Sequence, residues 1–226
     1  MFYLILAVII VLIIFGPRLW VNYAIRKHNK PIEEMPGTGA ELAEHLIERF
    51  KLEGVTVKKT AKDEDYYSPT EKIVGLSPEV YDGKSISAIA IAAHEVGHAI
   101  QYIKQEPVSR LRDKYTGRAV AAQNFGIIIL SLSPLLGGMA RTPVVIGILA
   151  LAGILAMLSS VVLHALILPE EYDASFGKAL PILNEGYLPP EHMPAARQVL
   201  KACALTYVAG ALADILSVWR WLAILR

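Results

Sequence analysis

The pattern H-E-x-x-H occurs in this chain as HEVGH at residues 94–98, inside an Ala- and Ile-rich run from 85 to 103 without proline. Such a run predicts a helix, and residues four apart on a helix lie on one face, one turn from each other. His94 and His98 can then hold one Zn²⁺ from the same side. Glu95 reaches the edge of that face, where it can accept a proton from a water on the ion. The sequence therefore predicts a hydrolytic zinc site on a buried helix.

The alternative for these three residues is a polar cluster satisfied by hydrogen bonds inside a core helix. Burying imidazoles and a carboxylate without partners costs free energy. A helix made mostly of Ala and Ile gives no other reason to gather them. We therefore favour the metal site.

The composition favours a membrane protein. Of the 226 residues, 54% are apolar, and the mean hydropathy of +0.43 is high for an ordinary soluble domain. The N-terminal stretch lacks the basic start and cleavage site of a secretory signal, so it is interpreted as an uncleaved span. Stretches with few or no charges are long enough to cross a bilayer at 1–17, 119–140, 142–169 and 202–225. We expect a mainly α, multi-span membrane protein with four spans.

The distribution of basic residues predicts which side of the membrane each expected segment faces. A basic patch of Arg18, Arg26, Lys27 and Lys30 follows the first span, and the positive-inside rule places it in the cytoplasm. The chain is then an integral, multi-pass protein of the plasma (inner) membrane whose active site faces the cytoplasm. The expected segments are an anchor with its basic flank (1–30), a catalytic portion (31–118), a transmembrane hairpin (119–169), a cytoplasmic segment (170–201) and a last span (202–226).

The catalytic portion is predicted to be small and α+β. Leu42, Leu46 and Phe50 recur at helical spacing within 38–51, so an amphipathic helix is expected there. Short strands suit residues 55–57 and 72–77, joined by the polar segment 63–70. An edge strand beside the zinc helix could bind an extended peptide, although a hairpin that merely covers the helix fits equally well.

A catalytic zinc ion takes three protein ligands and keeps one position for water, so a third ligand is needed. Because two expected spans separate residue 118 from residue 170, the segment 170–175 returns to the side of the zinc helix. On spacing alone, both Glu170 and Glu171 qualify.

The motifs resemble those of the YugP-like neutral zinc metallopeptidases, which are membrane-embedded and distantly similar to the HtpX-type proteases. The resemblance covers nearly the whole chain and is carried by LSPEVYDGKSI (76–86), AAHEVGHAIQ (92–101), LPEEYDAS (168–175) and ALTYVA (204–209). It implies a gluzincin-like site in which Glu171 is the third zinc ligand. It also leaves two interpretations of Asp173, as a support for a zinc ligand or as a helix-start charge.

The resemblance further implies peptide-bond hydrolysis with Glu95 as the general base. Tyr207, in the ALTYVA motif, is a candidate donor to the oxyanion, and its alternative is an interfacial tyrosine. Expected partners are the lipid bilayer and protein or peptide substrates, membrane proteins among them. Accessory membrane proteins or an oligomer are left open.

Other classes compete with this interpretation or are excluded. The net charge of +1 gives no reason to expect nucleic acid binding, and a single cysteine, Cys203, excludes an intramolecular disulfide. A site-two-type intramembrane metalloprotease would use Asp214 as the zinc ligand instead of Glu171. A non-catalytic membrane adaptor stabilised by zinc would have no use for Glu95.

Overall fold

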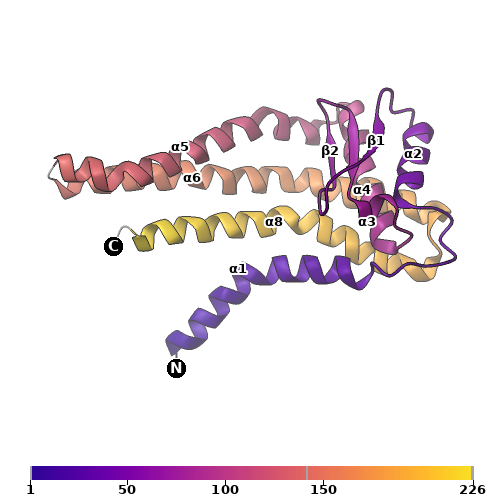
Figure 1. Ribbon diagram of the computed structural model, residues 1–226, viewed down its shortest axis with the longest axis horizontal. Helices are drawn as coiled ribbons and strands as arrows, with labels where there is room; N and C mark the ends of the chain where they lie inside the picture. The colour runs from indigo at the N-terminus through magenta and orange to yellow at the C-terminus, as the bar shows by residue number, and fades with distance from the viewer. Residues whose placement is uncertain (1, 141, 225–226) are drawn as a thin grey trace. The chain divides into compact units, whose positions relative to one another are not determined.

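The computed structural model of this chain describes residues 2–140 and 142–224, and these residues form two compact units (Figure 1). The first unit comprises residues 1–17, 111–167 and 207–226, and the second comprises 18–110 and 168–206. The division of the chain into five segments stays a prediction.

The described elements are mostly helical. Helices are α1 (Phe2–Lys27), α2 (Gly39–Arg49), α3 (Pro78–Tyr81), α4 (Ile86–Ile103), α5 (Arg110–Ala140), α6 (Pro143–Tyr172), α7 (Leu180–Ile182) and α8 (Met193–Ile224). Strands are β1 (Thr56–Lys59), β2 (Tyr66–Ser68) and β3 (Ile73–Leu76). Short 3₁₀ turns occur at η1 (Pro107–Ser109) and η4 (Pro190–His192), and π-helical segments at η2 (Asp173–Ala179) and η3 (Leu183–Tyr187).

Helix α4 is the centre of the second unit. Residues 86–101 are all buried, as expected for a helix that is apolar on every side. Its first turn is capped by Ser85, whose hydroxyl oxygen accepts a hydrogen bond from the Ala88 N–H at 3.0 Å. Helix α2, the sheet and η2 contact it. The predicted helix over the H-E-x-x-H run is confirmed.

Helix α2 confirms the predicted amphipathic helix. Thr38 caps it: the Thr38 hydroxyl accepts from the Glu41 N–H, and the Glu41 carboxylate accepts from the Thr38 N–H. Its buried face includes Leu42 and Leu46 and packs toward α4. Gly39 allows a close approach, because a Cβ there would lie 2.3 Å from the Val80 carbonyl oxygen.

The sheet differs from the expected arrangement. The strand order is β1-β3-β2, with β1 parallel and β2 antiparallel to β3. The segment expected only to connect two strands contains β2, in which Tyr66 is exposed and Tyr67 is buried. Strand β3 is buried along its whole length, so it needs a neighbour on each edge, and the polar segment supplies one.

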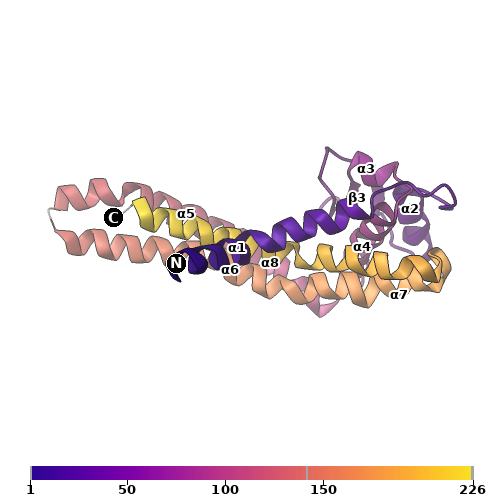
Figure 2. The same ribbon diagram turned by 90° about the horizontal axis from the view of Figure 1, so that it is seen from below.

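In the first unit, α5 and α6 run side by side in both views (Figures 1 and 2). Two glycines face each other across this contact: a Cβ on Gly126 would lie 2.7 Å from the Gly153 carbonyl oxygen. Small residues of this kind let two helix backbones approach closely. Leu130 and Met157 are buried beside them. Large apolar side chains on the outer faces stay exposed, among them Phe125, Ile128, Leu135, Ile148, Leu151, Leu155 and Val162.

The expectation of a multi-span membrane fold is wrong. Within the part of the chain that the structure describes, one helical stretch, Val144–Tyr187, is long and apolar enough to cross a membrane. The expectation rested on stretches with few or no charges, but the expected last span begins in the core of the second unit. Its first two residues, Ala202 and Cys203, are buried there. Most side chains of residues 1–14 lie outside the described residues.

We predict that Gly39→Ala destabilises the protein. The added methyl group would meet the backbone oxygens of Val80 and Ala88, which cannot rotate away, so α2 must shift. A loss of about 1–3 kcal/mol in unfolding free energy is expected. Gly117→Ala is the control, because nothing lies within 4 Å of a Cβ built there. Denaturant unfolding of the purified protein compares the two, and equal midpoints would contradict the close contact.

Candidate metal centre

The residues of the H-E-x-x-H motif lie where the sequence predicts, on one stretch of α4. His94, Glu95 and His98 are 4%, 8% and 5% exposed. The two imidazole rings are one helical turn apart, with centroids separated by 4.7 Å and planes at 80°. Two imidazoles and a carboxylate are therefore gathered inside a largely apolar core.

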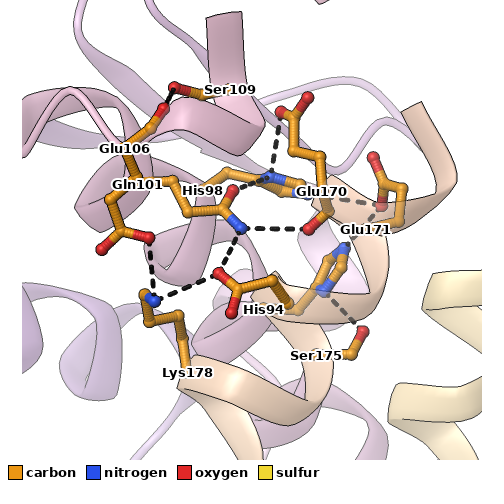
Figure 3. Close-up of polar contacts among 10 residues, drawn as sticks. His94, His98, Gln101, Glu106, Ser109, Glu170, Glu171, Ser175 and Lys178 are labelled. Carbon is orange, nitrogen blue, oxygen red and sulfur yellow. Dashed lines mark hydrogen bonds and ion pairs between the residues drawn. The ribbon is translucent and has the colours of Figure 1, made fainter. Parts of the chain in front are cut away.

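Glu171, at the end of α6, completes the group. Its Oε2 atom lies 3.3 Å from His94 Nε2 and 3.3 Å from His98 Nε2 (Figure 3). The three side chains are buried, and one donor atom from each lies within 4.8 Å of the others. This is the arrangement expected around zinc, because tetrahedral ligands about 2.1 Å from the ion are about 3.4 Å apart. Two nitrogens and one oxygen are also a donor set that zinc accepts.

Gly97 explains how the third donor comes so close to α4. A Cβ at this position would lie 2.8 Å from the Ala174 carbonyl oxygen, so only glycine lets η2 rest directly on the helix. Segment η2 begins two residues after Glu171, and its π-helical turns place Ser175 and Asp173 against the same part of α4. Such π-helical turns often occur at functional sites.

The Nδ1 atoms of the two histidines are hydrogen-bonded on the side away from Glu171. His94 Nδ1 lies 3.0 Å from Ser175 Oγ, and His98 Nδ1 lies 3.1 Å from Gln101 Oε1. A partner on one ring nitrogen orients the imidazole and directs the other nitrogen toward a metal. The sequence interpretation missed Gln101 and Ser175. The signal for Gln101 was its spacing of three residues from His98, on the same helix face.

Glu170 occupies a different place from Glu171. It is 3% exposed, and its Oε1 atom lies 3.6 Å from His98 Nδ1, not beside the two Nε2 atoms. The structure therefore gathers Glu171 with the histidines and puts Glu170 on the far side of the His98 ring. That Glu171 is the zinc ligand stays a prediction.

Electrostatics near the site keep the one thiol neutral. Burial and the negative charges of Glu95 and Glu171 raise the pKa of Cys203 well above its ordinary value. Burial also raises the pKa of Asp65, against the effect of hydrogen bonds that its carboxylate accepts from the Ser77 N–H and hydroxyl. Because a neutral buried thiol is a poor nucleophile, Cys203 serves packing.

Two further sequence candidates belong to the first unit. The Tyr207 ring lies 5.5 Å from the His164 ring, and the Arg112 guanidinium carbon lies 5.3 Å from the centre of the Tyr207 ring. Its predicted role as an oxyanion donor stays a prediction. Asp214 lies in α8, and its side chain is outside the described residues.

We predict that Gly97→Ala weakens zinc binding by at least about 10-fold, the lower end of the losses seen when supporting contacts of a metal site are removed. The methyl group would push η2 off α4 and carry Glu171 away from the histidines. Competition with a zinc chelator measures the affinity. The control is Gly117→Ala, on α5, where a Cβ meets nothing. Unchanged affinity in Gly97→Ala would contradict the role given to this contact.

Comparison with known proteins agrees with the geometry. The family model described as "Putative neutral zinc metallopeptidase" matches residues 3–226. A relative from Bacillus subtilis (strain 168), named "Putative membrane protease YugP", is 34% identical over 216 residues, which cover 92% of each chain. No solved structure matches the chain. The resemblance carried by the sequence motifs is confirmed, and the chain belongs to this family of neutral zinc metallopeptidases.

Proposed function

We propose that this protein is a membrane-attached, zinc-dependent peptidase whose metal ligands are His94, His98 and Glu171. The observation that carries the proposal is the convergence of two imidazole Nε2 atoms on one carboxylate oxygen, each 3.3 Å from it, inside a buried core. Three protein ligands leave one position on a tetrahedral ion for water, as hydrolytic zinc sites require. This is the gluzincin-like ligand set.

Glu95 supplies the proton chemistry in this proposal. A zinc ion held here would make a water molecule more acidic and would polarise the scissile carbonyl. Glu95 follows His94 on α4 and is 8% exposed, so the buried helix carries a carboxylate next to a proposed ligand. It accepts a proton from the attacking water and passes it to the leaving amine.

The sheet supports a substrate of extended shape. Strand β2 contacts α4, and its described pairing uses one edge only, toward β3. We propose that a peptide adds alongside the other edge of β2, where backbone hydrogen bonds would hold it without demanding a particular sequence. This mode suits the hydrolysis of varied protein or peptide substrates.

Membrane attachment is proposed from three observations. The relative's name describes a membrane protease. The stretch Val144–Tyr187 is apolar enough to cross a bilayer, and Leu151 and Leu155 on it are each 59% exposed. Arg18, Arg26, Lys27 and Lys30 of the second unit are exposed basic residues, which favours a cytoplasmic position for that unit.

The catalytic proposal is tested by zinc content and casein cleavage. We expect Glu171→Ala to lose both, because two histidines alone hold the ion poorly. Glu95→Gln should keep stoichiometric zinc and lose cleavage by about 10²-fold or more. Glu191→Gln, which changes an exposed carboxylate outside the site, is the matched control. Zinc in every variant with no cleavage by the wild type would favour a zinc-stabilised adaptor. Metal loss in Asp214→Ala, with metal kept in Glu171→Ala, would support the site-two-type alternative.

The attachment proposal is tested by fractionation of cells that express the full chain. We expect the protein to stay in the membrane pellet after high salt and after alkaline carbonate, because apolar burial in lipid withstands both. Leu151→Asp combined with Leu155→Asp should reduce this retention, since a carboxylate at mid-bilayer costs about 3 kcal/mol. Release of the wild type by carbonate would overturn the proposal.

A further inference from the structure

A chain of hydrogen bonds leads away from His98 through groups to which the proposed reaction gives no role (Figure 3). Gln101, which is fully buried, accepts at Oε1 from His98 Nδ1 across 3.1 Å. Its Nε2 donates to the Asp173 Oδ2 atom at 2.8 Å and to the Glu170 carbonyl oxygen at 3.0 Å. Lys178 Nζ then bridges Asp173 at 3.1 Å and Glu106 at 3.0 Å.

We propose that Asp173, acting through the Gln101 amide, holds His98 in the tautomer with its proton on Nδ1. Both are positioning residues, and the inference rests on the zinc site proposed above. Nε2 of His98 then carries its lone pair toward Glu171 and the metal position. The contacts of Asp173 and Gln101 thus determine, before a metal ion binds, which nitrogen of His98 can coordinate it.

The orientation of the Gln101 amide follows from its neighbours. The Glu170 carbonyl and the Asp173 carboxylate can only accept hydrogen bonds, so the NH₂ end of the amide must face them. The amide oxygen must then face His98. Exchanging the two ends would set the oxygen of a fully buried amide against two other oxygens.

The tautomer of His98 follows from that orientation. An amide oxygen cannot donate, so the ring nitrogen opposite it must carry the proton. Glu170 Oε1, at 3.6 Å from the same Nδ1 atom, is also an acceptor and favours the same choice. With the proton on Nδ1, the Nε2 lone pair points toward Glu171 Oε2 at 3.3 Å. Two acceptors facing each other at this distance are stabilised by a cation between them.

Segment η2 keeps Asp173 in place as an acceptor. Its wide turns bring Asp173 and Lys178, five residues apart, into contact. Gly177 leaves room for the carboxylate, because a Cβ there would lie 2.1 Å from Asp173 Oδ1. The Asp173 carboxylate acts on His98 through the Gln101 amide and does not contact the ring itself. It therefore adds no third carboxylate to Glu170 and Glu171, which already face the ring.

His94 offers a contrast inside the same site. Its Nδ1 atom meets the Ser175 hydroxyl at 3.0 Å. A hydroxyl can rotate to donate or to accept, so this contact orients the ring without fixing its tautomer. The constraint that we propose acts on His98, through the Gln101 amide.

The first test needs no variant. Full-length protein labelled with ¹⁵N in its histidines, metal-free and at a pH where imidazole is neutral, is studied by NMR in detergent. The expected result is a proton on Nδ1 of His98, assigned by comparison with His98→Gln. A proton on Nε2 in the wild type would overturn the proposal.

The second test measures zinc affinity by competition with a chelator. Asp173→Asn keeps the size of the side chain but adds a donor, so Gln101 can turn over. We expect binding about 10- to 100-fold weaker, the range seen when supporting contacts of metal ligands are lost. Ser175→Ala is the matched comparison: its His98 signal should keep Nδ1 protonated, whereas Asp173→Asn should show a mixture. Wild-type affinity in Asp173→Asn, with unfolding unchanged, would overturn the proposal.

These readouts separate the two proposals. If the wild type binds zinc but cleaves nothing, the peptidase proposal fails. The His98 tautomer and the zinc affinity of Asp173→Asn still decide whether Asp173 positions His98. If cleavage depends on Glu95 while Asp173→Asn behaves as wild type, the peptidase proposal stands and this inference fails.

Discussion

The second unit is organised around the partners that the buried polar side chains of α4 require. Helix α4 carries two imidazoles, a carboxylate and an amide into a core of Ala, Ile and Val, where water cannot solvate them. The end of α6 supplies the Glu171 carboxylate, and segment η2 supplies the Ser175 hydroxyl and the Asp173 carboxylate, each in contact with one of those groups. The contacts that offset the cost of burying these polar groups also assemble the candidate metal centre. Stability and chemistry therefore depend on one set of interactions.

The spacing of apolar residues along the sequence was enough to predict helices α2 and α4. The apolar periodicity of α2 and the H-E-x-x-H run of α4 both gave the correct helices, with capping by Thr38 and Ser85. The pairing of β2 with β3 was missed because its register depends on a buried neighbour that comes later in the chain. Gln101 was missed for a related reason: its spacing of three residues from His98 was a signal, but its other partners, Glu170 and Asp173, lie far along the sequence.

The error over membrane spans has a physical origin. Counting charges cannot distinguish a stretch that faces lipid from one that faces a protein core. The expected last span, 202–225, begins in a protein core, because Ala202 and Cys203 are buried in the second unit. A lipid-facing stretch is distinguished from a core-facing one by its burial in the folded chain. A window of sequence does not contain that information.

The place of Glu171 in the chain has a consequence for biosynthesis. The two histidines are made early, on α4, whereas the carboxylate that faces them follows α5 and most of α6. Under the proposed function, a nascent chain would carry Glu95 and two metal ligands before the third ligand is made. Completion of the proposed centre would then wait until translation has passed the end of α6.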